Sequence, residues 1–214
     1  AIGYRALKLN ATTNQNTAVG TDALATNVAG GNTAVGYLAL YANTTGTGNV
    51  AVGWSALDAA TTATNNTGVG YGALGSTTTG GSNTAVGYGA LDTNSTASNN
   101  TAMGYNALTA NTGGAGNTAV GYTTLDANTT GAYNVAVGYN SLTANTTADA
   151  NTAIGNSVMT ANTTGTLNTA VGQAALASNT TANNNVAIGV SALNANSTGA
   201  VSYTHLTLPT IYSV

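Results

Sequence analysis

The hydrophobic positions of this chain recur with a period of 17 residues, except for a first step of 16 from Asn16 to Asn32. Numbered from its first asparagine, the unit follows the consensus N-T-A-V-G-Y-x-A-L-x-A-N-T-T-G, with Val, Ile or Met at position four, glycine at position five and Leu or Met at position nine. A fixed short period is the signature of a stacked-repeat architecture. Residues 1–200 are therefore predicted to form one repeat domain of twelve units, the first of which enters at its third position. Complete units begin at Asn16, Asn32, Asn49, Asn66, Asn83, Asn100, Asn117, Asn134, Asn151, Asn168 and Asn185.

The alternation within T-A-V-G-Y predicts a short β-strand, because successive side chains of a strand point to opposite faces. Valine replaces threonine at position two in three units, at Val50, Val135 and Val186. We therefore expect positions two and four to face the interior. The following x-A-L-x-A is expected to be a second extended segment that supplies leucine from the opposite wall. N-T-T-G is expected to be a turn, since asparagine tolerates left-handed backbone.

An amphipathic helix is the competing interpretation. The unit is rich in β-branched Thr and Val and carries a central glycine, both of which disfavour a helix. The aliphatic residues are also five positions apart, which does not match the spacing of three or four of a helical stripe. Disorder is disfavoured because the aliphatic residues recur so regularly. The pattern predicts an all-β fold, a parallel β-solenoid (β-roll) of about twelve 17-residue coils.

Stacking of coils would turn each position of the unit into a row along the molecule. The asparagines at positions one and twelve are expected to hydrogen-bond from amide to amide between coils. Acids occupy position ten in every second unit, at Asp58, Asp92 and Asp126, which keeps like charges apart. Position six carries an aromatic row, the candidate surface contact, whose two interpretations are packing against a neighbouring chain, which is favoured, and stacking on sugars. This row comprises Tyr37, Trp54, Tyr71, Tyr88, Tyr105, Tyr122 and Tyr139.

Composition excludes several functions. The chain has two basic residues, Arg5 and Lys8, whereas a nucleic-acid partner requires many phosphate-neutralising cations. No apolar run approaches the length of a membrane span. Residues 1–200 contain no His, Cys or Glu, so we expect no catalytic, cofactor-binding or metal site and do not expect an enzyme. The N-x-[ST] sequences at Asn43, Asn128 and Asn162 are interpreted as repeated turn residues rather than glycosylation sites.

The last segment, residues 201–214, does not follow the repeat. It holds His205 and Pro209, the only histidine and proline of the chain. Its first ten residues resemble the translation of a transposase-type sequencing adapter, which predicts a non-native or disordered tail on a gene from metagenomic assembly. Because the chain starts in the middle of a unit and without Met, it is expected to be a piece of a longer protein.

The segments NTAVGYGAL at Asn83, NTAIG at Asn151 and NVAIG at Asn185 resemble the head repeats of trimeric autotransporter adhesins (YadA-like heads). The full unit is also similar to repeats of bacteriophage tail fibres. The resemblance covers residues 1–200 and implies a β-roll, a homotrimer, and a stalk or receptor-contacting role outside the cell. The 17-residue unit is longer than the usual unit of the adhesin heads, so the shape of the coil is expected to differ.

These observations lead to one main functional hypothesis. The chain is expected to be an extracellular structural or adhesive fibre segment of a phage tail fibre or bacterial surface adhesin, spacing or presenting a tip that binds a host-surface glycan or protein receptor. The alternative is an ice-binding β-solenoid that uses stacked Thr rows at positions thirteen and fourteen. A polysaccharide-degrading spike is the weakest hypothesis, because it requires acids gathered in one groove.

Overall fold

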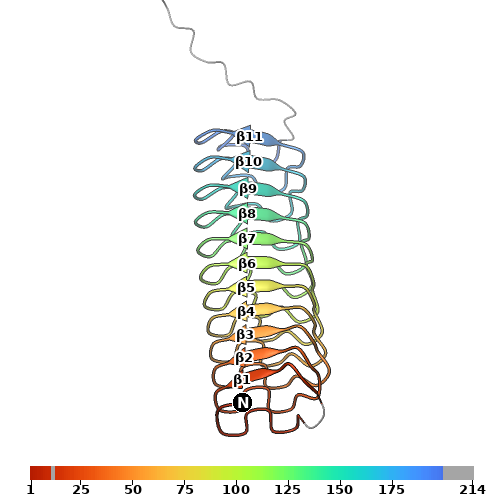
Figure 1. Ribbon diagram of the computed structural model, residues 1–214. Coiled ribbons are helices and arrows are strands. Elements are labelled where there is room, and N and C mark those ends of the chain that lie inside the picture. The colour runs from red at the N-terminus through yellow and green to blue at the C-terminus, as the bar shows by residue number, and fades with distance from the viewer. Residues whose placement is uncertain (11–12, 200–214) are drawn as a thin grey trace, which may run out of the picture.

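The computed structural model describes residues 1–10 and 13–199, and these form a column of stacked coils (Figure 1). Each complete coil contributes one three-residue strand to one eleven-stranded parallel sheet, whose spatial order follows the sequence. The strands are β1 (Thr17–Val19), β2 (Thr33–Val35), β3 (Val50–Val52), β4 (Thr67–Val69), β5 (Thr84–Val86), β6 (Thr101–Met103), β7 (Thr118–Val120), β8 (Val135–Val137), β9 (Thr152–Ile154), β10 (Thr169–Val171) and β11 (Val186–Ile188). The predicted tail, residues 201–214 with His205, lies outside the described residues.

The strands are aligned so that equivalent residues of successive units lie side by side. Val86 pairs with Met103, and Met103 pairs with Val120. The incomplete first coil joins the same sheet through a bridge from Ile2 to Val19. The predicted parallel β-solenoid is therefore confirmed, and the helical alternative is wrong, since the described residues contain no helix.

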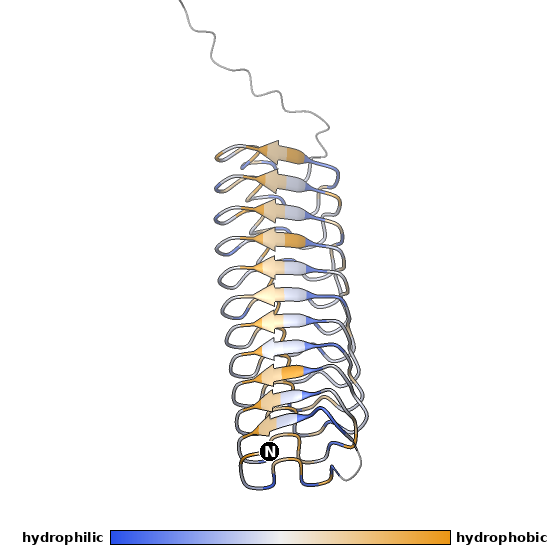
Figure 2. Cartoon of the chain, in the orientation of Figure 1, coloured by the Kyte–Doolittle hydropathy of each residue, from blue (hydrophilic) through white to orange (hydrophobic). Residues whose placement is uncertain are grey.

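The strand faces are the reverse of the prediction. The middle residue of every strand is buried, whereas the residues at positions two and four lie on the outer face, as Ala102 between Thr101 and Met103 illustrates. The reason is the small cross-section of the coil, which leaves room for an alanine methyl group but not for a row of valines. The outer face is therefore a band of Thr and Val side chains that follows the sheet along the column. The strands that carry it lie one above another, coloured by hydropathy in Figure 2.

The segment around the leucine is not a second strand. It folds into tight turns with two left-handed residues per coil, at positions seven and nine, as Asn106 (φ 50°) and Leu108 (φ 55°) show. A left-handed non-glycine residue costs about 1–2 kcal/mol. At position nine, burial of the leucine side chain contributes about 1.5–3 kcal/mol, which offsets the cost of the left-handed backbone at that one residue. A third left-handed residue lies at position 17. The prediction that the asparagine of N-T-T-G has a left-handed backbone is therefore wrong.

The core is a column of leucines lined by alanines. The leucine at position nine is fully buried from Leu24 to Leu176, with Met159 replacing it in one coil. That coil also carries Val158 where most of the others have alanine at position eight. An unbranched methionine adapts to irregular space, so it accommodates the larger neighbour.

Buried asparagines hold successive coils together, as predicted. At position one, the backbone N–H of Asn134 donates to Oδ1 of Asn117 at 2.9 Å, and its Nδ2 donates to the carbonyl of Ala148 at 2.8 Å. At position twelve, Nδ2 of Asn128 donates to Oδ1 of Asn111 at 3.0 Å and to the carbonyl of Gly131 at 2.9 Å. These amide ladders satisfy polar groups that would otherwise be costly to bury.

Glycine at position five allows the coils to stack closely. Gly104 has φ +134°, a conformation open essentially to glycine alone. A Cβ atom built on Gly104 would overlap the carbonyl oxygen of Gly121 in the next coil. The same relationship holds for most of the row, so backbone meets backbone along this edge.

Candidate functional site

The aromatic residues at position six form one continuous row, here called the aromatic ladder. Adjacent ring centroids are 5.1–6.0 Å apart along the whole row. Trp54 meets Tyr37 edge to face at an interplanar angle of 75° and is tilted by 49° from Tyr71. From Tyr71 to Tyr139 the rings are stacked, with interplanar angles of 8–11°. The predicted row therefore exists as a set of contacting rings.

Stacking decides what the aromatic ladder can present to a partner. Each ring from Tyr88 to Tyr122 has both faces covered by its neighbours, while its side chain remains about half exposed. The free surface of these rings is consequently their edges and phenol groups. Sugar rings cannot lie on the faces of these inner tyrosines, so the interpretation of sugar stacking fails for this part of the ladder. Packing against a neighbouring chain stays a prediction.

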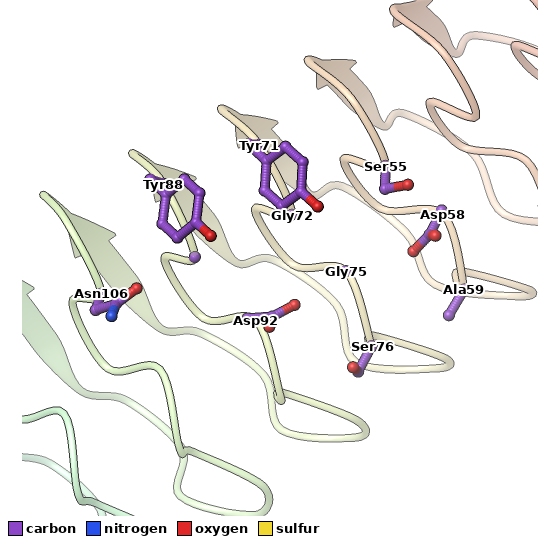
Figure 3. Close-up of a pocket in the computed structure, with 11 residues that line it drawn as sticks. Ser55, Asp58, Ala59, Tyr71, Gly72, Gly75, Ser76, Tyr88, Asp92 and Asn106 are labelled. Atoms are coloured by element: carbon purple, nitrogen blue, oxygen red, sulfur yellow. The ribbon is translucent and has the colours of Figure 1, made fainter.

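A trough runs beside the aromatic ladder where three glycines interrupt the usual side chains (Figure 3). Gly72 and Gly89 occupy position seven of consecutive coils, and Gly75 occupies position ten. Without side chains at these places, the surface opens into a recess of about 510 Å³. Tyr71 and Tyr88 line one side of it. The sequence analysis missed this trough, although the three glycines in otherwise non-glycine rows were a visible signal.

Two carboxylates line the side of the trough opposite the tyrosines. Asp58 and Asp92 come from coils on either side of Gly75, and their side chains point toward it (Figure 3). A Cβ atom built on Gly75 would lie 2.7 Å from Oδ1 of Asp92 and 3.7 Å from Oδ1 of Asp58. The predicted alternation of acids thus places both carboxylates at one site, with the intervening residue reduced to a glycine.

Burial changes the acidity of these groups. Partial removal from water disfavours the charged form and raises the pKa of Asp58 and Asp92. For Asp58, a hydrogen bond with Ser55 opposes this effect, and the nearby charge of Asp92 adds to it. Asp126, in the same row outside the trough, has its pKa raised by burial as well. Partial burial thus has the same effect on the pKa of all three acids of this row.

The basic residues lie far along the column from the trough. Arg5 belongs to the first coil and donates from Nε to Oδ1 of Asp22 at 2.5 Å. Lys8 lies in the same coil. Nothing cationic among the described residues therefore offsets the charges of Asp58 and Asp92 at neutral pH.

The asparagines of the N-x-[ST] sequences are structural. Asn43, Asn128 and Asn162 are fully buried, and each donates from Nδ2 to the carbonyl of the residue three positions later, at 2.9–3.0 Å. A buried amide held in this way is closed to glycosylation in the folded rod. Each of them lies directly before a bend and belongs to the position-twelve ladder.

The threonines at position thirteen bond to the neighbouring coil. The hydroxyl of Thr129 donates to the carbonyl of Thr146 at 3.0 Å, and that of Thr163 donates to the carbonyl of Thr180 at 3.1 Å. These residues lie in bends rather than in the strand. The rows at positions thirteen and fourteen are therefore not a flat strand face. This counts against an ice-binding surface formed by these two rows.

Comparison with known proteins gave no assignment: no family model, curated protein or solved structure matched the chain. Within residues 1–10 and 13–199, no helix is long and apolar enough to cross a membrane. The same residues contain no group of three or more His, Cys, Asp or Glu side chains placed to hold a metal ion. The aromatic ladder, the trough and the outer face of the sheet are thus the surface features available to a partner among the described residues.

Proposed function

We propose that this chain is a non-enzymatic segment of an extracellular adhesive fibre, from a phage tail fibre or a bacterial surface adhesin. Its role is to space or present a receptor-binding tip. The observation that supports this proposal most is the uninterrupted column of eleven in-register strands. A rod of this kind separates its two ends by a fixed distance set by the number of coils, at about 4.8 Å per coil.

The contacts between coils suit a spacer. Successive coils are joined through the strand, the asparagine ladder at position one and the backbone near position five, and in most coils also through the ladder at position twelve. Asn117, Asn134 and Asn151 illustrate the bonds at position one. Because these bonds repeat on several sides of the column, bending at one coil strains several rows together. The rod should therefore resist bending better than a linker of similar length.

We propose that three copies pack side by side through the outer face of the sheet. This face carries a row of partly exposed apolar side chains at position four, with Val35 36% exposed, Met103 42% and Ile154 39%, beside the threonines of position two. Exposed apolar side chains that gather on one face are typical of a surface that contacts another protein. A homotrimer would cover the three bands around one axis and leave the aromatic ladders available for contacts with a host-surface glycan or protein.

Analytical ultracentrifugation and electron microscopy of purified residues 1–200 test this proposal. A trimeric rod is the expected result, and Met103→Lys should dissociate it, because a charge would then lie in the buried band. Thr163→Lys, in a bend away from the sheet, is the matched control and should leave the trimer intact. A stable monomer for the unmodified chain would contradict the trimeric fibre.

A second candidate function, ice binding, draws support from the same face. Thr and Val at positions two and four project outward in register, for instance Thr118 and Val120 of β7, and their neighbours in β6 and β8 repeat them. The result is a flat grid of hydroxyl and methyl groups spaced about 4.8 Å along the axis and about 6.6 Å along the strand. A regular grid of this kind could order water in a lattice, and it differs from the Thr rows expected from the sequence.

The two functions make opposite predictions, because one face cannot serve both. An ice-binding protein must be a monomer or present this face to water, and it must show thermal hysteresis. A trimer that shows no thermal hysteresis supports the fibre, whereas a monomer with hysteresis that is lost in Thr118→Lys supports ice binding.

A further inference from the structure

We infer that the trough beside Tyr71 and Tyr88 is a binding site for a short, uncharged carbohydrate. This inference rests on the proposed contact-making role outside the cell, and it names the ligand class for one site on the rod. It differs from the idea of sugars stacked on aromatic faces, since the faces of these rings are largely covered within the ladder.

The trough has the dimensions of a site for a small extended ligand. Ser55 and Asn106 close its ends at position seven, and they are three coils apart, which is about 14 Å at ~4.8 Å per coil. Its volume of about 510 Å³ falls within the range of small-molecule sites. The floor is backbone at Gly72, Gly75 and Gly89, so a ligand can approach closely. These dimensions suit a chain of two or three sugar rings lying along the rod.

The two long sides of the trough offer complementary polar groups. The phenol groups of Tyr71 and Tyr88 can both donate and accept hydrogen bonds, and they point toward the trough (Figure 3). On the other side, the carboxylates of Asp58 and Asp92 each offer two acceptor oxygens. Two neighbouring hydroxyl groups of a sugar ring can donate to the two oxygens of one carboxylate. Hydrogen bonds to a charged acceptor of this kind are stronger than those between neutral groups.

Charge narrows the class of carbohydrate. A sialylated, sulfated or uronic-acid sugar would bring a negative charge against Asp58 and Asp92, and the two basic residues of the chain, Arg5 and Lys8, lie in the first coil. Juxtaposed like charges are costly in a complex. A calcium ion prefers six to eight oxygen ligands, more than two carboxylates supply. An uncharged sugar can hydrogen-bond to the phenol and carboxylate groups of the trough, and it is not repelled by Asp58 and Asp92.

The decisive variant fills the trough with residues that the protein itself uses at the same positions. Gly72→Asn combined with Gly75→Thr introduces the residue types found at position seven in Asn106 and at position ten in Thr109. Gly72 has φ +62°, which asparagine tolerates, and its Cβ would meet only Oδ1 of Asp92, at 3.6 Å. At Gly75 the Cβ would lie 2.7 Å from Oδ1 of Asp92, the end of a flexible side chain that can move aside, and 3.2 Å from the carbonyl oxygen of Gly72. The filled rod should therefore fold normally.

A matched control exists elsewhere on the rod. Ala174→Asn combined with Ala177→Thr introduces the same side chains at positions seven and ten of the coil that begins at Asn168. A third variant, Asp92→Asn, keeps the shape of the trough and removes one charged acceptor. Circular dichroism and sedimentation of all three variants report whether fold and assembly are unchanged.

The experiment applies the full chain to arrays of neutral, sialylated and sulfated oligosaccharides, followed by calorimetric titration of the neutral hits and of calcium chloride. We expect binding of neutral oligosaccharides, at least a tenfold weakening in the filled variant, a smaller loss in Asp92→Asn, and no change in the control. The inference is overturned if the wild type retains no neutral oligosaccharide, if only acidic glycans or calcium bind, or if the filled variant binds as well as the wild type.

These outcomes separate the trough from the proposed fibre. A trimeric rod that binds no sugar overturns the trough site alone, because sedimentation of the same sample still shows the assembly. A monomer that binds neutral sugar, with loss in the filled variant, overturns the trimer and leaves the site. In a trimer, three troughs on one rod would raise the avidity for a sugar-coated surface beyond the affinity of one site.

Discussion

The side-chain oxygen of Asn43 is buried without a hydrogen-bond donor, and the next coil carries Ala60, which has no donor, at the equivalent position. In most other coils, the asparagine of the later coil donates to the one before, as Asn111 does to Asn94 at 3.0 Å. Ala60 and Thr77 are the two residues that interrupt this ladder at position twelve. An unsatisfied buried acceptor costs about 1–3 kcal/mol, so this gap is a weak point of the rod.

Restoring the ladder should stabilise the protein. The double substitution Ala60→Asn with Thr77→Asn supplies a donor to Asn43 and joins the two halves of the ladder. We expect an increase of about 1–2 kcal/mol in the free energy of unfolding, measured by denaturant titration. The coil of Ala60 has an alanine, Ala63, at position fifteen, where several other coils have glycine. An asparagine fits in such a coil, because Asn94 and Asn145 each donate to the carbonyl of an alanine at position fifteen.

Ala60→Leu is the control for this experiment, since leucine has a shape close to that of asparagine but no donor. It should leave Asn43 unsatisfied and give no gain in stability. Equal stabilisation by leucine would show that filling space, rather than the hydrogen bond, is responsible.

Close backbone contact at position five predicts strong sensitivity to a single methyl group. Gly104→Ala should destabilise the rod by about 3 kcal/mol or more, because the new Cβ meets the rigid backbone of Gly121 and the residue is held at φ +134°. Gly72→Ala is the matched change at a position where the Cβ has space, and we expect a loss of about 1 kcal/mol or less for its φ of +62°. Thermal melts of the two variants that coincide would refute the proposed role of the position-five glycines.

The left-handed turn at position seven predicts that glycine is favourable there. Ala174 has φ 55° and makes no polar side-chain contact, so Ala174→Gly relieves backbone strain. Part of this gain is lost to the greater freedom of glycine in the unfolded chain, which leaves about 0.5–1 kcal/mol of net stabilisation. The adjacent Ala175→Gly removes a buried methyl group from the core and should destabilise the rod by about 1 kcal/mol. Chemical unfolding that ranks the two variants in the opposite order would contradict the assignment of strain.

The half-buried aspartates predict how stability depends on pH. Burial raises the folded-state pKa of Asp58, Asp92 and Asp126 above the ordinary value of 3.8. The folded state then binds protons more readily than the unfolded state, so these groups lower stability at neutral pH, and the penalty disappears as pH falls through their folded pKa toward 3.8. Thermal unfolding should therefore occur at a higher temperature at pH 4 than at pH 7.

Replacing all three aspartates by asparagine tests this pH effect. The triple variant should melt at nearly the same temperature at both pH values and should exceed the wild type at pH 7. A wild type that melts at a lower temperature in acid, with the triple variant unchanged, would show that these carboxylates stabilise the rod when charged.

The sequence predicted the stacking but not the conformation of each coil. The period of 17 residues specifies which residue lies above and below each position. The alignment of Val86 with Met103 and the asparagine ladders could therefore be predicted from the sequence. Which strand face turns inward depends on the width of the coil, and this width is set by turns at leucines such as Leu108, a residue type that rarely adopts φ 55°. The pattern T-A-V therefore suggested the wrong face.

The candidate site divides in the same way. The aromatic row was visible at position six because its members recur, whereas the trough depends on residues that break the recurrence, Gly72, Gly75 and Gly89. A residue type that recurs at one position of the unit is visible in the sequence as a row. A binding site on a repetitive scaffold lies instead where a coil departs from the repeat, because only there can a ligand distinguish one coil from the next.

The asparagine ladders have a consequence for how the chain folds. In both ladders the later residue donates and the earlier accepts, as Asn49 does to Asn32 and Asn145 to Asn128. Each finished coil thus presents side-chain oxygen acceptors on which the following 17 residues can dock, without waiting for any distant part of the sequence. Folding can therefore begin at any coil and spread from neighbour to neighbour along the column.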